Sequence, residues 1–260
     1  MSVIASVVQS VFQPVVQRVD GAPSVLSEAY GAWGTYDFYG TGNAVVRLRN
    51  TASSPTERDF TATELTDGTY TSWYSSGQTY VSKMYDQKGS NDIFHASATF
   101  HHKYDASDNT VQCYQASQYS RSQLFSNVST DLANTFDNNS SVDTRTTLVV
   151  SGKKPSGSVG FTDYPAFGLY EGYAPTSFIN RGHRSLIVGG GSFGTKVGVS
   201  MRTEGPGSYV TFEQFQSDFS SSFKTYHALF TRRPSGSGVV TDLDLYQDGT
   251  QTIDSTSTNL

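Results

Sequence analysis

Charged and apolar residues are both scarce in this 260-residue chain. Only 16% of its residues are Asp, Glu, Lys or Arg, and 36% are hydrophobic. Soluble globular domains average about 25% charged and about 45–50% apolar residues, so small polar residues, glycine and tyrosine make up the difference here. This balance is typical of an all-β protein. Disorder is excluded because 16 Tyr, 16 Phe and 2 Trp supply a large area to bury.

The sequence also lacks a basic excess, a cysteine pair and a long apolar run. Its 18 Lys and Arg stand against 23 Asp and Glu, which gives a net charge of −5 and argues against a nucleic-acid partner. Cys113 is the single cysteine, so no internal disulfide can form and packing must hold the fold. No apolar run reaches the roughly 18 residues of a membrane span, and we therefore expect none.

Three groups of residues resemble ligand sites, and each has a simpler explanation. Asp242, Asp244 and Asp248 could offer oxygen ligands to calcium, but a hairpin turn fully explains Asp248-Gly249. His101 and His102 are adjacent, so a regular strand points them to opposite faces. Residues 189–194 match a dinucleotide-binding glycine pattern, but a strand-like run follows where that motif needs a helix. We expect neither a metal nor any other cofactor.

The first 19 residues differ from the rest of the chain. Between residues 7 and 18 an apolar pair recurs every four residues, a period that matches neither a strand nor a regular helix. Gln9, Gln13 and Pro14 interrupt the apolar positions, so we interpret the segment as retained rather than as a signal peptide. Such an apolar repeat must be shielded from water. It could dock on another protein, on further copies of this chain in an oligomer such as a trimer, or along an edge of its own domain. The predicted docking residues are Val7, Val8, Val11, Phe12, Val15 and Val16.

After a short linker, the sequence predicts strands separated by turns. Asp67-Gly68 and Asp248-Gly249 are turn signals, and only residues 131–136 suggest a short helix. This spacing predicts an all-β jelly-roll sandwich over residues 24–260, with residues 1–19 as an extension. The predicted strands are 45–49, 80–85, 146–151, 185–188, 196–202, 209–215, 225–231 and 239–246.

Two parts of the sequence carry patterns that occur in known families. The first part consists of Ala29, Tyr30, Tyr39, the run 42–49, Asp59, Phe60, Leu65, Trp73 and the run 80–89, YVSKMYDQKG. It resembles the start of the arabinofuranosidase B type catalytic domain. The second part, residues 225–230 and 243–250, is similar to the closing strands of laminin-G and concanavalin-like jelly rolls. Both resemblances imply a concanavalin-like jelly roll.

Such domains also occur in bacteriophage structural proteins, where a Val/Gln-rich N-terminus similar to residues 7–18 often precedes them. The adjacent cysteines of the enzyme family are absent here, and its catalytic carboxylates align with no definite position. The resemblance therefore implies a non-enzymatic virion protein, either a capsid decoration or head-fibre protein or a tail component. Its expected partners are other virion proteins or copies of itself, bound through residues 1–19, and a host-surface glycan. The alternatives are an arabinofuranosidase-like glycoside hydrolase and a carbohydrate-binding adhesion module.

The candidate sugar-binding residues lie in an aromatic, glycine-rich stretch of the second half. Aromatic rings on loops can stack on sugars, although filling the core beneath the loop is the alternative role. A glycosidase would also need two facing carboxylates, for which Glu171 and Glu213 are candidates; a solvent-facing strand position explains Glu213 equally well. The predicted carbohydrate-binding residues are Tyr164, Tyr170, Glu171 and Tyr173.

Overall fold

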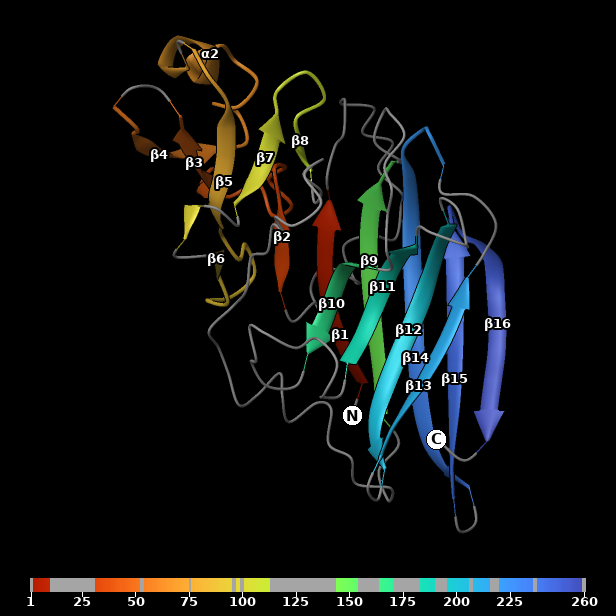
Figure 1. The fold of residues 1–260 in the computed structure, drawn as a ribbon. Helices are drawn as coiled ribbons and strands as arrows, with labels where there is room; N and C mark the ends of the chain where they lie inside the picture. The colour runs from red at the N-terminus through yellow and green to blue at the C-terminus, as the bar shows by residue number, and fades with distance from the viewer. Residues whose placement is uncertain are drawn as a thin grey trace. The chain divides into compact units, whose positions relative to one another are not determined.

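The computed structural model shows an all-β protein that divides into two compact units (Figure 1). Unit 1 consists of Met1–Ala5 and Val128–Leu260, and unit 2 of Ser6–Asn127. The described residues are 2–9, 31–51, 54–74, 76–94, 97–98, 101–112, 144–153, 164–170, 183–189, 196–205, 208–215, 220–235 and 238–258. Strands dominate these ranges, and their one helix is the short α2 (Thr69–Trp73). The predicted all-β class is confirmed, whereas the jelly-roll sandwich and its extent over residues 24–260 stay predictions.

Unit 1 contains two antiparallel sheets. In one sheet the strands run in the order β16-β15-β14-β9, and β1 follows β9; in the other, four successive strands form hairpins in the order β10-β11-β12-β13. The strands are β1 (Ser2–Gln9), β9 (Thr144–Gly152), β10 (Tyr164–Tyr170), β11 (His183–Gly189), β12 (Lys196–Gly205), β13 (Ser208–Phe215), β14 (Lys224–Ser235), β15 (Gly238–Gln247) and β16 (Thr250–Thr258).

One hydrophobic core joins the two sheets of unit 1. In β14, Tyr226, Ala228 and Phe230 are buried while the residues between them are only half-buried, which is the period of two expected of a strand with one covered face. Val197 and Val199 reach the same core from the other sheet. The complete core cluster is Leu148, Val150, Val197, Val199, Tyr226, Ala228, Phe230, Leu243, Leu245 and Ile253.

The turn between β15 and β16 has the geometry that its sequence predicts. Asp248 and Gly249 both have positive φ, 49° and 82°, as the tight turns that suit a twisted hairpin require. The Asp248 carboxylate also accepts hydrogen bonds from the Thr225 amide at 2.9 Å and the Lys224 ammonium at 2.7 Å. The Asp248 carboxylate thus links the hairpin turn to the start of β14.

Asp244 on β15 is held beside like charges. It lies directly opposite Asp254 of β16, and burial, followed by the charge of Asp254, raises the pKa of the Asp244 carboxyl. A carboxyl whose pKa rises on folding contributes its full stability below the unfolded-state pKa and loses it as the pH rises through the folded-state pKa. The negative charge of Asp244 therefore opposes folding at neutral pH.

Changing Asp244 to Asn is expected to raise the free energy of unfolding at pH 7 by about 0.2–1 kcal/mol, because it removes this repulsion. Urea unfolding at pH 7 and pH 3 checks the sign, since the gain should vanish at pH 3, where Asp244 is protonated. Asp248→Asn is the matched control and should lower stability at pH 7, because it weakens the pairing with Lys224. A loss of stability in Asp244→Asn at pH 7 would contradict this account.

Unit 2 is built on a third antiparallel sheet, in the order β4-β3-β5-β7-β8. A short strand pairs with the end of β5, and Val7 to Gln9 of β1 pair in parallel with β2. Phe60, Leu48 and Val81 are fully buried in its core. The strands are β2 (Ala32–Gly34), β3 (Ala44–Asn50), β4 (Glu57–Thr61), β5 (Thr79–Met84), β6 (Ile93–Phe94), β7 (His102–Asp105) and β8 (Thr110–Gln112).

Local sequence patterns located most strands of both units. All eight predicted strands coincide with observed ones, namely β3, β5, β9 and β11 to β15; only Tyr85 falls just outside its strand. The predicted docking residues Val7 and Val8 lie on the strand β1 and pair with β2, so the expectation that the repeat forms no strand is wrong for these two residues. Val11, Phe12, Val15 and Val16 lie outside the described residues, as does the helix suggested at 131–136. Within the part of the chain that the structure describes, no helix has the length and hydrophobicity that crossing a bilayer requires.

Candidate functional site

The short helix α2 gathers aromatic side chains at one end of unit 2. Tyr70, Trp73 and Tyr74 are spaced three and four residues apart, so they share one face of the helical turn. The ring of Tyr70 packs edge-on against Phe60 at 6.0 Å and Tyr104 of β7 at 5.2 Å, and Trp73 packs on Phe60 at 5.2 Å. These contacts anchor a helix of five residues that would not be stable by itself.

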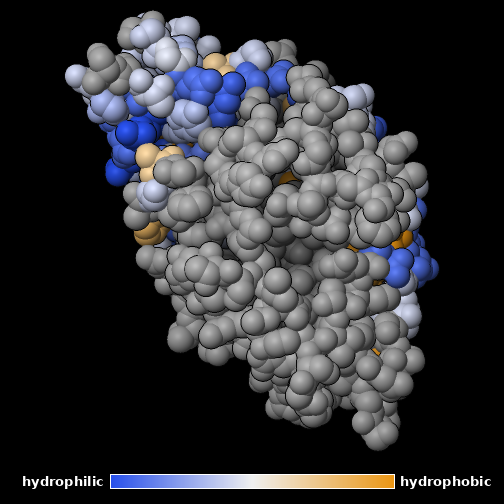
Figure 2. Space-filling model, viewed as in Figure 1, coloured by the Kyte–Doolittle hydropathy of each residue, from blue (hydrophilic) through white to orange (hydrophobic). Residues whose placement is uncertain are grey.

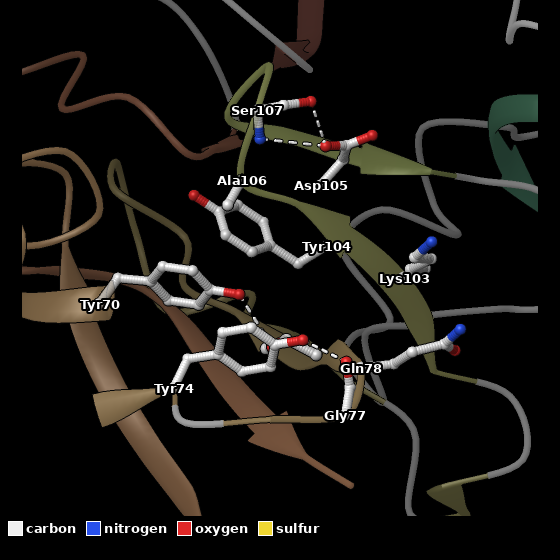
Figure 3. A pocket seen from close by; sticks show the side chains of 10 residues that line it. Tyr70, Tyr74, Gly77, Gln78, Lys103, Tyr104, Asp105, Ala106 and Ser107 are labelled. Carbon is white, nitrogen blue, oxygen red and sulfur yellow. Dashed lines mark hydrogen bonds between the residues drawn. The ribbon is translucent and has the colours of Figure 1, made fainter. Parts of the chain in front are cut away.

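Beside this cluster lies a cavity of about 380 Å³, here called the tyrosine pocket (Figure 3). In the close-up, the rings of Tyr70, Tyr74 and Tyr104 gather on one side of the pocket, and the side chains of Lys103 and Gln78 lie on the other. The lining residues are Tyr70, Tyr74, Gly77, Gln78, Thr79, Lys103, Tyr104, Asp105, Ala106 and Ser107.

Each tyrosine of the pocket is fixed by packing and by its hydroxyl. The ring of Tyr74 stacks on that of Tyr70, with centroids 5.5 Å apart and an interplanar angle of 10°. The Tyr70 hydroxyl bonds Thr79 Oγ1 at 2.9 Å, the Tyr104 hydroxyl donates to Asn109 Oδ1 at 2.9 Å, and the Tyr74 hydroxyl donates to the Gly77 carbonyl. Tyr70 and Tyr104 are buried whereas Tyr74 is half-buried, so Tyr74 is the ring that a ligand can reach most easily.

The polar groups of the pocket come from the paired strands β5 and β7 and from residues near their ends, Gln78 and Ser107. Tyr80 is the register partner of Lys103, and because side chains alternate along a strand, Lys103 and Asp105 share one face of β7. The Asp105 carboxylate accepts bonds from the Ser107 amide at 3.0 Å and the Ser107 hydroxyl at 2.6 Å. Burial raises the pKa of Tyr104 above its ordinary value of 10.0, so its phenol stays protonated across the physiological pH range.

This arrangement suits binding better than hydrolysis. Flat rings offer apolar faces, and an amide, an ammonium and a carboxylate at the rim offer hydrogen-bond partners for hydroxyl groups. Glycoside hydrolysis needs a pair of carboxyl groups, and among the residues that line the pocket only Asp105 carries one. The pocket can therefore hold a polyhydroxylated ligand but lacks the two carboxyl groups for cleaving it.

The end of the run 80–89, one of the segments that carry the resemblance to arabinofuranosidase B type domains, belongs to a structural cluster, here called the Asp86 cluster. The buried Asp86 carboxylate accepts bonds from the backbone amides of Ala32, Lys88 and Asn91 at 3.0–3.1 Å, and from the Asn91 side chain at 3.3 Å. A Cβ on Gly89 would lie only 3.1 Å from Asp86 Oδ2, so glycine keeps this turn open. The cluster ties the start of β2 to the turn after β5.

Gln87 extends this connection to the next segment. Its backbone N–H donates to the Ala32 carbonyl at 2.8 Å. Its side-chain oxygen accepts from the Phe38 backbone N–H at 2.9 Å, and its side-chain nitrogen donates to the Tyr36 carbonyl at 2.7 Å. The Trp33 indole completes the connection by donating to the Asn91 carbonyl at 2.8 Å. Asp86 and Gln87 are thus explained by the hydrogen bonds they make within the protein.

The predicted sugar-binding residues fall in a different part of the chain from the tyrosine pocket. Tyr164 and Tyr170 are the first and last residues of the strand β10, so the expectation of a loop is wrong for these two residues, and Glu171 and Tyr173 lie outside the described residues. Their role in sugar binding stays a prediction. On either side of the glycine pattern, β11 and β12 pair as antiparallel strands with Gly189 opposite Lys196, so the strand predicted after the pattern is confirmed; residues 190–194 lie outside the described residues. Within the described ranges, no group of three or more His, Cys, Asp or Glu side chains is placed to hold a metal.

Sequence reasoning missed the tyrosine pocket. The signal available was the helical spacing of Tyr70, Trp73 and Tyr74 directly after the Asp67-Gly68 turn, which begins a helix rather than a hairpin. Tyr104 gave no local signal because it reaches the cluster only through the pairing of β5 with β7.

No family model, curated protein or solved structure matches the chain. The resemblances drawn from the sequence therefore stay predictions. The geometry of the tyrosine pocket and the properties of the sequence carry the functional argument.

Proposed function

We propose that the protein is a non-enzymatic carbohydrate-binding module, displayed as a structural component of a virus particle, and that the tyrosine pocket is its sugar site. The single observation that carries the sugar-binding part is the half-buried Tyr74 ring at the pocket, stacked on Tyr70 and facing a polar rim. Rings held in place before binding lose little conformational entropy when a ligand arrives. A preformed aromatic surface with a few polar groups is the usual architecture of a small-ligand site.

The surface character of the described residues favours a polar ligand over an apolar protein partner. Where described residues reach the surface in Figure 2, most are hydrophilic and the hydrophobic ones are scattered. The exposed large hydrophobic residue among them is Tyr36, at 39% exposure. A sugar is recognised by hydroxyl contacts and one stacked ring, and it requires no extended apolar patch.

Binding and cleavage are separated by one experiment on the intact protein. We expect the protein to bind members of a glycan array and to release no reducing sugar from the bound glycans, including arabinose-containing ones, on prolonged incubation. Release of sugar that is lost when Asp105 is changed to Asn would contradict the non-enzymatic assignment and favour the glycoside hydrolase. Absence of binding across the array would contradict the sugar site.

The particle role is supported by the sequence alone. The Val/Gln repeat at residues 7–18 needs a cover, and docking on other virion proteins or on further copies of this chain would provide one. The proposed fold is a concanavalin-like jelly-roll sandwich, favoured by the two facing sheets of unit 1 and by the pairing of β9 with the distant β14. Gold-labelled antibodies against the protein should decorate intact phage particles; a protein found in infected cells but not in purified particles would contradict the role.

A further inference from the structure

Lys103, at the edge of the tyrosine pocket, differs from the other described lysines in having no ion pair or ring contact with a described residue. Among the lysines whose side chains the structure describes, Lys83 pairs with Asp92 at 2.6 Å and Lys224 with Asp248 at 2.7 Å. Two more lie over aromatic rings: Lys88 over Tyr39 and Lys153 over Phe223. The Lys103 ammonium makes no such contact with any described residue, although its side chain is half-buried and lines the cavity.

The nearest acidic residue along the strand does not neutralise Lys103. Asp105 lies two residues further along β7 but forms no ion pair with Lys103, and its Oδ1 already accepts two bonds from Ser107. Figure 3 shows the Lys103 side chain together with Gln78, and the Asp105 carboxylate together with Ser107. The rim thus has a cationic end, with one ammonium and one amide, beside the stacked pair of Tyr70 and Tyr74.

We propose that the tyrosine pocket selects sugars that carry an acid group, such as uronic or sialic acids, and that the sugar carboxylate pairs with Lys103 while the sugar ring packs on Tyr74. This inference rests on the proposed sugar site and adds the class of its ligand. A half-buried ammonium gains a charge-assisted hydrogen bond when a carboxylate arrives, and a neutral sugar cannot supply one. Because the pocket is open to solvent, we expect a preference of roughly tenfold rather than the larger effect of a fully buried pair.

The test compares each acidic sugar with its methyl ester, which keeps the ring and removes the charge. Uronic and sialic acids are presented beside their esters to the wild-type protein and to the variants Lys103→Gln and Tyr74→Ala. We expect the wild type to bind acids roughly tenfold more tightly than esters, and this preference to weaken with added salt. In Lys103→Gln the preference should disappear, so that each acid and its ester bind with equal affinity, because the charge contact is removed.

Two results overturn the inference and separate it from the proposed function. If the wild type binds acids and esters equally and Tyr74→Ala loses both, the acid preference is wrong and the sugar site stands. If the wild type binds neither, the sugar site itself is wrong, and the inference falls with it. Retention of the full acid preference in Lys103→Gln would likewise overturn the role of Lys103.

Discussion

Replacing Asp86 with Ala is expected to destabilise unit 2 by at least about 3 kcal/mol. The substitution leaves four N–H donors without their acceptor, namely the amides of Ala32, Lys88 and Asn91 and the Asn91 side chain. Ala32 and Asn91 are buried, so water cannot replace the lost carboxylate there. Burying an unsatisfied donor costs about 1–3 kcal/mol, so two or three such donors account for the expected loss.

Tryptophan fluorescence during denaturant unfolding measures this effect, because both tryptophans of the chain, Trp33 and Trp73, belong to unit 2. Asp37→Ala is the matched control: Asp37 also accepts backbone bonds, from Tyr39, Thr41 and Gly42, but two of the three are exposed. Water can replace the acceptor at those sites, so we expect a loss below about 1 kcal/mol. Similar losses for the two variants would show that burial of the Asp86 cluster is not what stabilises it.

Changing Tyr74 to Ala is expected to weaken sugar binding at least about tenfold, which is about 1.4 kcal/mol. The substitution removes the accessible ring of the pocket but leaves Tyr70 and Tyr104 in the core. Tyr74→Phe keeps the ring and loses only the hydroxyl bond to the Gly77 carbonyl, so it should retain most of the affinity. Isothermal titration with the tightest ligand of the glycan array measures both variants.

Two further observations make this prediction specific to the pocket. Tyr36→Ala removes a more exposed tyrosine that does not line the cavity, and it should bind sugar as the wild type does. The unfolding transition followed by tryptophan fluorescence should shift little in Tyr74→Ala, because Tyr74 is only half-buried. Wild-type affinity in Tyr74→Ala would contradict the assignment of the sugar site.

The strands were predictable because their signal is local. In β14 the run of β-branched and aromatic residues predicts a strand, and the structure buries Tyr226, Ala228 and Phe230 on one face of it. Asp248-Gly249 predicts the turn that follows β15. Each of these patterns spans fewer than about ten residues, so no knowledge of distant parts of the chain was required.

The tyrosine pocket was not predictable in the same way because its parts are distant in sequence. Tyr74 follows a helix of five residues, a length at which intrinsic propensity says little and tertiary packing decides. Tyr104 contacts Tyr70 only after β5 and β7 pair, which brings residues more than 30 positions apart into one site. The run 80–89 carries the resemblance to a known family. Its structural role depends on a distant segment, because Asp86 and Gln87 accept hydrogen bonds from residues within 32–38.

Amide chemical-shift mapping tests the central claim most directly. An isotope-labelled sample of the intact protein is titrated with the tightest glycan while two-dimensional amide spectra are recorded. The account predicts saturable shifts at residues that line the tyrosine pocket, including Gly77, Gln78, Lys103 and Asp105, and none at these positions in Tyr74→Ala. Saturable shifts confined to residues 164–173, with the tyrosine pocket unchanged, would contradict it.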